Sequence, residues 1–296
     1  MKVLNFGSLN IDYVYQVDHM VRAGETLASD GREAFPGGKG LNQSVALARA
    51  GVPVYHAGLI GGDGGMLLDV CRENGIVARF IREMPGPSGH TIIQVDKTAQ
   101  NCILLYAGSN GQMTPDFVDE VLSHFDRGDL LLLQNEINLL PYLIDRAYDR
   151  GMTVVLNPSP IGPALKECDL SKVSLFLLNE IEGSVLSGCD SPEGIMDYMR
   201  KTYPSARTVL TLGKDGSWYF DADTALRQQA YTVDAVDTTA AGDTFTGYFL
   251  SALLKELPVA QALELASRAS ALAVTRKGAV PSIPLWDEVQ AFAPQS

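Results

Sequence analysis

The sequence predicts an α/β protein whose central sheet is mostly parallel. Short, continuous apolar runs alternate along the chain with segments in which apolar residues have helical spacing. Continuous apolar runs are typical of strands buried on both faces, and their alternation with helices is typical of βαβ units. No linker, repeat or shift in composition divides the chain, so we expect a single domain over residues 1–296. The expected strands are Val3–Phe6, Val54–Ile60, Leu130–Leu133, Val154–Leu156, Leu175–Leu178 and Val209–Leu212.

Helices are expected between these strands. The segment Asn42–Ala50 is followed by Gly51, a residue typical of a helix C-terminus. Thr114-Pro115-Asp116 predicts the start of another helix, with threonine as N-cap and proline in the first turn. The remaining expected helices are Asn138–Arg150, about Ala240–Leu254 and Pro258–Lys277.

Two regions break the alternation. Asp12–Phe35 contains strand-like pieces and has no room for a helix. Thr91–Val95 and Cys102–Tyr106 flank the polar stretch Asp96–Asn101, which predicts a β-hairpin. We therefore expect residues of about 12–35 and 88–107 to form a small β-sheet that acts as a lid over a site.

The bulk properties exclude some partners. The formal net charge is −12 and the sequence pI is about 4.7, a balance that does not favour nucleic acid or an anionic membrane as a partner. No run is apolar enough for a signal peptide or a membrane span. The cysteines lack metal-ligand spacing and indicate reduced thiols in a cytoplasmic protein. They are Cys71, Cys102, Cys168 and Cys189.

The stretch Asp237–Phe245, with the sequence DTTAAGDTF, indicates phosphoryl transfer. A strand-like segment, Tyr231–Val236, precedes it, and Ala240–Gly242 is expected to form the first turn of a helix. Free N–H groups there would bind an anion, and the small side chains would let a phosphate approach. Asp243 in that turn is placed to take a proton from a nucleophile that attacks the phosphate. The alternative is an ordinary helix start with acidic residues.

Polar residues suited to a polyol follow other expected elements. Asn10 and Asp12 come just after the first strand, and Glu136 follows the run Leu130–Gln134. The carboxyl ends of strands are where α/β sheets bind ligands. The glycine-rich stretch Pro36–Gln43, which contains Asn42, could bring backbone and amide groups to the same ligand. Ordinary turns are the alternative for each of these segments.

Three further segments suit a nucleotide or a cation. Asn179 and Glu182 could hold Mg²⁺ through water and steady a phosphate, or form a simple helix start. Thr211–Gly216 could carry a nucleotide or form a hairpin turn. Thr275–Ser282 is a helix end whose carbonyls attract cations, although most such turns bind nothing. The chain contains neither a Walker A loop nor a GxGxxG string.

In their order and spacing these motifs resemble the PfkB family of carbohydrate kinases, and within it the ribokinases. The similarity covers essentially the whole chain. Three strings carry it: Gly37-Gly38-Lys39-Gly40-x-Asn42-Gln43, Asp237-Thr238-x-Ala240-Ala241-Gly242-Asp243-Thr244-Phe245 and Thr275-Arg276-Lys277-Gly278-Ala279-x-Pro281-Ser282. Supporting strings are Gly7-Ser8-x-Asn10-x-Asp12, Tyr106-Ala107-Gly108-Ser109-Asn110 and Asn179-x-x-Glu182.

The resemblance implies a Rossmann-like three-layer α/β/α sandwich with a β-sheet lid that often also forms a dimer interface. It implies ATP-dependent, in-line phosphorylation of a sugar hydroxymethyl group, with D-ribose converted to ribose 5-phosphate as the first expectation. Asp243 matches the catalytic base. Ala240, Ala241 and Gly242 match the anion hole for the phosphoryl group.

The same resemblance assigns the remaining positions. Those matching sugar contacts are Asn10, Asp12, Gly38, Lys39, Asn42, Glu136 and Asp243. Those matching ATP contacts are Asn179, Thr211, Gly213, Gly216 and Gly242. Glu182 matches the Mg²⁺ and phosphate position. Those matching a K⁺ site, largely through backbone carbonyls, are Asp237, Thr239, Ala273, Arg276, Gly278 and Ser282.

Departures from the family pattern leave the sugar open. They occur at Leu41, Met66, Leu178 and Ser267. Alternatives within the family are kinases of fructose, of a ketodeoxy sugar acid, of a sugar phosphate or of a nucleoside, for which Tyr13 and Tyr15 are the only nearby lid aromatics. Outside the class, a non-catalytic sugar-binding regulator is disfavoured by the intact Asp243, and a nicotinamide dehydrogenase by the missing GxGxxG.

Overall fold

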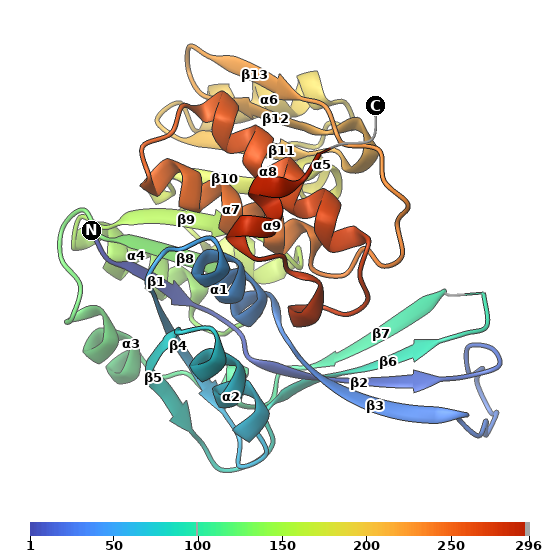
Figure 1. The fold of residues 1–296 in the computed structure, drawn as a ribbon. Helices are drawn as coiled ribbons and strands as arrows, with labels where there is room; N and C mark the ends of the chain where they lie inside the picture. Colours follow the sequence, from blue (N-terminus) through green and yellow to red (C-terminus); the bar gives the residue numbers. More distant parts are fainter. Residues whose placement is uncertain (99, 294–296) are drawn as a thin grey trace.

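The computed structural model describes residues 1–98 and 100–293, and its main sheet is nine-stranded (Figure 1). From β11 to β5 every pairing is parallel, and β12 and β13 are antiparallel strands at one edge. The strand order is β13 (Ala225–Gln228), β12 (Ser217–Phe220), β11 (Arg207–Thr211), β10 (Leu175–Asn179), β9 (Thr153–Asn157), β8 (Leu130–Gln134), β1 (Val3–Phe6), β4 (Val54–Ile60) and β5 (Val77–Glu83).

Helices cover both faces of this sheet, which gives three layers (Figure 1). Leu130 and Leu132 of β8 pack into one apolar cluster with α1, α2, α7 and α8, whereas Leu131 and Leu133 pack into a second with α3, α4 and α6. Alternate side chains of a strand point to opposite faces, so a continuous apolar run fills two cores at once. The helices are α1 (Lys39–Arg49), α2 (Gly65–Glu73), α3 (Pro115–Leu122), α4 (Leu140–Asp149), α5 (Glu180–Ser187), α6 (Pro192–Thr202), α7 (Ala241–Leu254), α8 (Val259–Val274) and α9 (Trp286–Ala291).

The apolar runs expected to be strands all lie in this sheet, so the predicted α/β class is correct. One expectation is wrong. Tyr231–Val236 is not a strand but an irregular connection, in which the N–H of Val236 donates to the carbonyl of Val274 at the end of α8 at 2.7 Å. Its alternating apolar pattern is typical of a strand, but its backbone is tied to a helix end and forms no ladder.

A second sheet of four strands projects from the main body (Figure 1). Its order is β3 (Gly31–Gly37), β2 (Asn10–Gln16), β6 (Gly89–Val95) and β7 (Asn101–Tyr106). β6 and β7 pair in antiparallel fashion, which confirms the predicted hairpin; its turn contains Ala99, which lies outside the described residues. Because β1 leads directly into β2, Asn10 and Asp12 lie where the two sheets meet.

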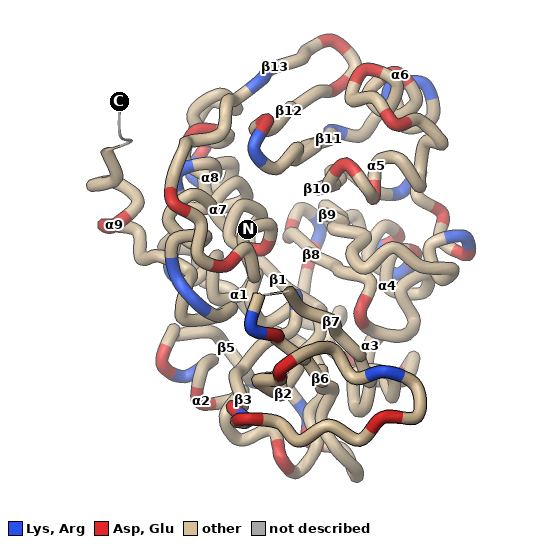
Figure 2. Tube along the Cα trace, turned by 90° about the vertical axis from the view of Figure 1, so that its right-hand side faces the viewer, with Lys and Arg blue, Asp and Glu red and all other residues tan. Residues whose placement is uncertain are grey.

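Charged residues of both signs are interspersed over the loops and helix ends, without an extended basic stripe in the view shown (Figure 2). Among the described residues, no helix combines the length and the apolar composition that a membrane crossing requires.

Candidate active site

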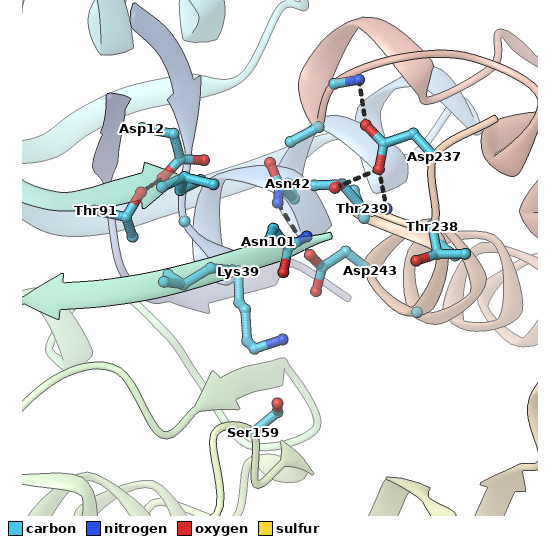
Figure 3. Close-up of a pocket in the computed structure, with 18 of the residues that line it drawn as sticks. Asp12, Lys39, Asn42, Thr91, Asn101, Ser159, Asp237, Thr238, Thr239 and Asp243 are labelled. Carbon is cyan, nitrogen blue, oxygen red and sulfur yellow. Dashed lines mark hydrogen bonds between the residues drawn. The ribbon is translucent and has the colours of Figure 1, made fainter. Parts of the chain in front are cut away.

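A cavity of about 1100 Å³ lies between the carboxyl ends of the parallel strands and the second sheet (Figure 3). Most of the predicted site residues line it. These are Asn10, Asp12, Gly38, Lys39, Asn42, Glu136, Asn179, Glu182, Thr211, Asp237, Thr239, Ala240, Ala241, Gly242, Asp243 and Gly278. Five predicted residues are not among its lining residues, namely Gly213, Gly216, Ala273, Arg276 and Ser282.

The first turn of α7 opens into this cavity. Ala240, its N-cap, has φ 58°, so the chain turns sharply and the helix begins at Ala241. First-turn N–H groups lack intrahelical acceptors. Ala241 donates to the carbonyl of Thr238 at 3.3 Å, which leaves Gly242 and Asp243 as the residues whose N–H groups face an incoming anion. A Cβ at Gly242 would meet only open space, so this glycine borders the room that a phosphate would fill.

Asp243 is 6% exposed, and amides hold both of its carboxylate oxygens. Asn42 of α1 donates from Nδ2 to Oδ2 at 3.0 Å, and Gln43 donates from Nε2 to Oδ1 at 2.8 Å. Asn42 lies in the cavity with its own Oδ1 buried and without a hydrogen-bond partner. Gly38, with φ 93°, lets α1 begin close enough to present both amides to α7.

Glu136, after β8, is fixed by two donors on the same oxygen. Oε2 accepts from the hydroxyl of Ser8 at 2.5 Å and from the N–H of Lys39 at 3.0 Å. Burial raises the pKa of Glu136, and this outweighs the charge of Lys39 and these hydrogen bonds, which lower it. Oε1 carries neither of these bonds and can accept from a ligand hydroxyl.

Asp12 of β2 faces the same space. Its Oδ1 accepts from the hydroxyl of Thr91 on β6 at 2.5 Å. Burial raises the pKa of Asp12 to about 6, against the hydrogen bond from Thr91, and the negative charges of Glu136 and Asp243 add to the rise. Carboxylates that repel each other in a partly closed cavity are suited to hydroxyl donors, which relieve that repulsion.

Lys39 extends across the cavity toward Ser159 (Figure 3). Burial lowers the pKa of Lys39, but the negative charges of Asp243, Glu136 and Glu182 raise it, and the net shift is upward. The ammonium group therefore stays charged, and it would attract an anionic group in the cavity.

Asn179 and Glu182 form a reciprocal cap at the start of α5. Asn179 accepts from the N–H of Glu182 at 2.8 Å, while Glu182 accepts from the N–H of Asn179 at 3.0 Å and from its Nδ2 at 3.1 Å. The ordinary helix start considered above is thus present. Thr211 ends β11, and the tight turn to β12 carries Gly213 and Gly216, so this segment is also the hairpin turn considered above.

The chain is similar in sequence and in fold to proteins of known class. The model of the pfkB family of carbohydrate kinases matches residues 1–286. The chain belongs to this family. It is 36% identical to a ribokinase of Staphylococcus aureus, over 97% of this chain and 98% of the relative, and 30% identical to a deoxyribokinase of Salmonella typhimurium, over 99% and 98%. A structure of Arabidopsis thaliana ribokinase complexed with ribose and ATP superposes with a TM-score of 0.86 at 27% identity, and covers 98% of this chain and 97% of that one.

In this pfkB family member the loop before α7 adjoins the loop after α8. Asp237 accepts from the N–H and hydroxyl of Thr239 at 2.9 and 2.6 Å, and from the N–H of Gly278 at 2.9 Å (Figure 3). Burial raises the pKa of Asp237, but these hydrogen bonds and the charge of Lys277 bring it below its usual value. Arg276 pairs with Glu288 at 2.7 Å, so its side chain is engaged elsewhere.

The donor set for Mg²⁺ is sparse. Within the described part of the chain, no group of three or more His, Cys, Asp or Glu side chains is arranged to hold a metal ion. The carboxylate of Glu182, which lines the cavity beside Asn179, fits an ion that is held mainly by nucleotide phosphates and water.

Four amide side chains near Asp243 were not predicted as site residues. They are Asn5, Gln43, Gln134 and Asn157, from β1, α1, β8 and β9. Gln43 belongs to the glycine-rich string, and Gln134 ends an apolar run. A polar side chain at the end of a buried strand is the signal that points to Gln134 and Asn157.

Proposed function

We propose that the chain transfers the γ-phosphoryl group of ATP to the hydroxymethyl group of a small sugar, with D-ribose as the substrate and ribose 5-phosphate as the product. The observation that carries this proposal is the position of Asp243, in the first turn of α7 between free helix N–H groups and the polar side chains of α1 and β2. Relatives named as ribokinases support D-ribose.

The reaction follows from the residues around the cavity. Hydroxyls of the sugar donate to Asp12 and Glu136, and amide groups of Asn10 and Asn42 complete the set. Asp243 accepts the proton of the hydroxymethyl group as that oxygen forms its bond to the γ-phosphorus, and the bond to the β–γ bridging oxygen breaks to release ADP. The free N–H groups of Gly242 and Asp243 in the first turn of α7, together with Lys39, stabilise the negative charge on the transferred group.

The nucleotide lies along the carboxyl ends of β10 and β11 in this proposal. Asn179 and Thr211 line the cavity there, and the turn with Gly213 and Gly216 adjoins them. Glu182 would hold Mg²⁺ through water, and the ion would neutralise phosphate charge. The loops of Asp237–Thr239 and Ala273–Ser282 would hold K⁺, chiefly through backbone carbonyls.

The small sheet is proposed to act as a lid on a single domain and as the interface of a homodimer. Its inner face brings Val14, Ile93 and Leu105 over the cavity, which would exclude water. Its outer strand β7 is exposed along its whole length, with Leu104 67% exposed. Leu104→Asp should therefore give monomers in light scattering, whereas Ile181→Asp, at a 64% exposed position on α5, should not. A cytoplasmic location is consistent with the four free cysteines.

The substrate is tested with a panel of D-ribose, 2-deoxyribose, fructose, a ketodeoxy sugar acid, a sugar phosphate and nucleosides, each with ATP and Mg²⁺, with and without K⁺. ADP release is the readout. We expect the highest kcat/KM with D-ribose. 2-Deoxyribose is the second candidate, because a deoxyribokinase is among the relatives. Absence of turnover with every free sugar would overturn the proposal.

A further inference from the structure

A row of amide side chains adjoins Asp243, and it runs from Asn157, which also lines the cavity, through Gln43 and Gln134 to Asn5 in the interior. Gln43 is the member in contact with Asp243: Nε2 donates to Asp243 Oδ1 at 2.8 Å and to Asn157 Oδ1 at 3.0 Å. Its Oε1 accepts from Nε2 of Gln134 at 2.7 Å. Gln43 and Gln134 are completely buried, and neither is among the residues that line the cavity.

Backbone carbonyls fix the direction of every hydrogen bond in this row. Asn157 donates from Nδ2 to the carbonyl of Leu177 at 2.8 Å, so its oxygen must face Gln43. At the other end Asn5 donates from Nδ2 to the carbonyl of Gly40 at 2.7 Å, so its oxygen accepts from Gln134 at 3.0 Å. Since a carbonyl can only accept, both ends are set.

A rotated Gln43 would be unfavourable at all three of its contacts. Its oxygen would face the oxygens of Asp243 and Asn157, and its NH₂ group would face the NH₂ group of Gln134. In a dry interior each such mismatch leaves a polar group unpaired. Gln43 is therefore held as a donor toward Asp243.

The row adds no charge of its own. It continues from Asn5 to Ser44 at 2.8 Å and from Ser44 to Nδ1 of His56 at 2.8 Å. His56 is completely buried, and this burial lowers its pKa to about 4, so the ring is neutral near pH 7. The negative charge of Asp243 is thus met by oriented dipoles on its inner side.

We propose that Gln43 is a positioning residue for the phosphoryl transfer, which holds Asp243 by Oδ1 and leaves Oδ2 for the sugar hydroxyl. This inference rests on the proposed role of Asp243. The two oxygens differ in what their partners can do. Asn42, on Oδ2, lines the cavity and can exchange its bond for one to a sugar, whereas Gln43, on Oδ1, is enclosed. A carboxylate that accepts hydrogen bonds from donors is favoured in its charged form.

Other ionisable groups face Asp243 and must stay unchanged in the test. They are Lys39, Asp12 and Glu136, whose charges couple to that of Asp243. Gln43→Met keeps the size of the side chain and removes its hydrogen bonds. Gln43→Glu keeps an acceptor for Gln134 and places a second carboxylate against Oδ1.

The experiment measures kcat and KM against pH for both variants. We expect kcat to fall by about 10- to 100-fold, because a misplaced reacting group costs up to that much. We expect the acidic limb of the kcat profile to move up by about one pH unit in Gln43→Met, and further in Gln43→Glu, where two carboxylates share a proton. The KM for ATP should stay within about threefold of the wild-type value, because Gln43 contacts neither the cavity nor the nucleotide.

Ser251→Ala is the matched control. Ser251 is completely buried and donates to the carbonyl of Ala50 at 2.9 Å, so it joins the same two helices without contacting Asp243. It should lower stability and leave the pH profile unchanged. If Gln43→Met does not fold, the dependence of kcat on pH in Gln43→Glu tests the proposal in its place.

Asp243→Asn is measured in parallel to separate the two claims. If this variant is inactive and both Gln43 variants keep a wild-type acidic limb and kcat within about twofold, the role of Gln43 is overturned and the proposed function stands. If Asp243→Asn retains wild-type turnover, the base is misassigned and both proposals fall.

Discussion

Asn42 Nδ2 donates to Asp243 Oδ2 at 3.0 Å, and this bond joins the first helix of the chain to its seventh, 201 residues apart. The amide that caps the carboxylate is itself in the cavity, with its oxygen unpartnered. A polyol that enters the cavity can satisfy that oxygen and take the place of the amide at Oδ2. In the proposed reaction, this bond is the one that the sugar replaces when Asp243 becomes available as the base.

Asn42→Ala removes a proposed sugar contact and leaves the nucleotide side of the cavity unchanged. We expect the KM for the sugar to rise by about 10-fold or more, the scale of one or two hydrogen bonds. The KM for ATP should not change. Steady-state kinetics with each substrate varied in turn provide the measurement, and an unchanged sugar KM would show that Asn42 does not bind the sugar.

Gly242→Ala adds a methyl group in the space assigned to the phosphoryl group. The backbone there is helical and a Cβ meets no atom within 4 Å, so the variant should fold at least as stably as the wild type. Turnover should fall by about 10-fold or more, because the methyl group displaces the charge that the helix N–H groups stabilise. Thermal unfolding and ADP release are compared. A variant that is both stable and fully active would remove Gly242 from the anion site.

Glu182→Gln distinguishes the role of Glu182 as a helix cap from its proposed role as a Mg²⁺ ligand. The variant can still accept from the N–H of Asn179 but loses the carboxylate charge. We expect the Mg²⁺ concentration for half-maximal activity to rise several-fold, with a stability loss of about 1 kcal/mol or less. Glu180→Gln, an exposed position in the same first turn, is the control and should leave the Mg²⁺ dependence unchanged. Equal behaviour of the two variants would mean that Glu182 is only a cap.

Asp12→Asn should stabilise the ligand-free protein at high pH. The folded-state pKa of Asp12, about 6, lies above the unfolded value of 3.8. The stability that its protonated form contributes is therefore fully present below the unfolded value and is lost as the pH rises through about 6. At about pH 8 the variant should be more stable than the wild type by on the order of 1–3 kcal/mol, and at about pH 4 the difference should nearly vanish. Urea unfolding at both pH values checks this; a difference independent of pH would contradict it.

Much of the fold could be predicted, because the sequence of a buried parallel strand is a continuous run of apolar residues. Val54–Ile60 was delimited to the residue as β4. β5, by contrast, was not predicted. It lies at an edge of the sheet and contains Arg79 and Arg82, so its sequence is not a continuous apolar run. Tyr231–Val236 has the alternation of a strand but no neighbouring strand, and the sequence contains no sign of that absence.

Part of the candidate site could also be predicted from the sequence, and part could not. Polar residues at strand ends and a glycine-rich helix start, such as Asn10 and Gly38, could be predicted because the carboxyl edge of a parallel sheet collects them. The bond from Gln43 to Asp243 could not, because it joins residues 200 apart and depends on how α1 and α7 pack. The two hydrogen bonds that Glu182 accepts from Asn179 could not be predicted either, because they depend on the geometry of the helix cap.

The central claim is that Asp243 takes the proton of a sugar hydroxyl as ATP is consumed. Its most direct test is the turnover of Asp243→Asn with D-ribose, ATP and Mg²⁺, with calorimetric binding of sugar and nucleotide measured on the same preparation. We expect kcat to fall by about 10²- to 10⁴-fold, the range for loss of a general base, while both ligands still bind. Turnover close to that of the wild type would contradict the assignment of Asp243 as the base.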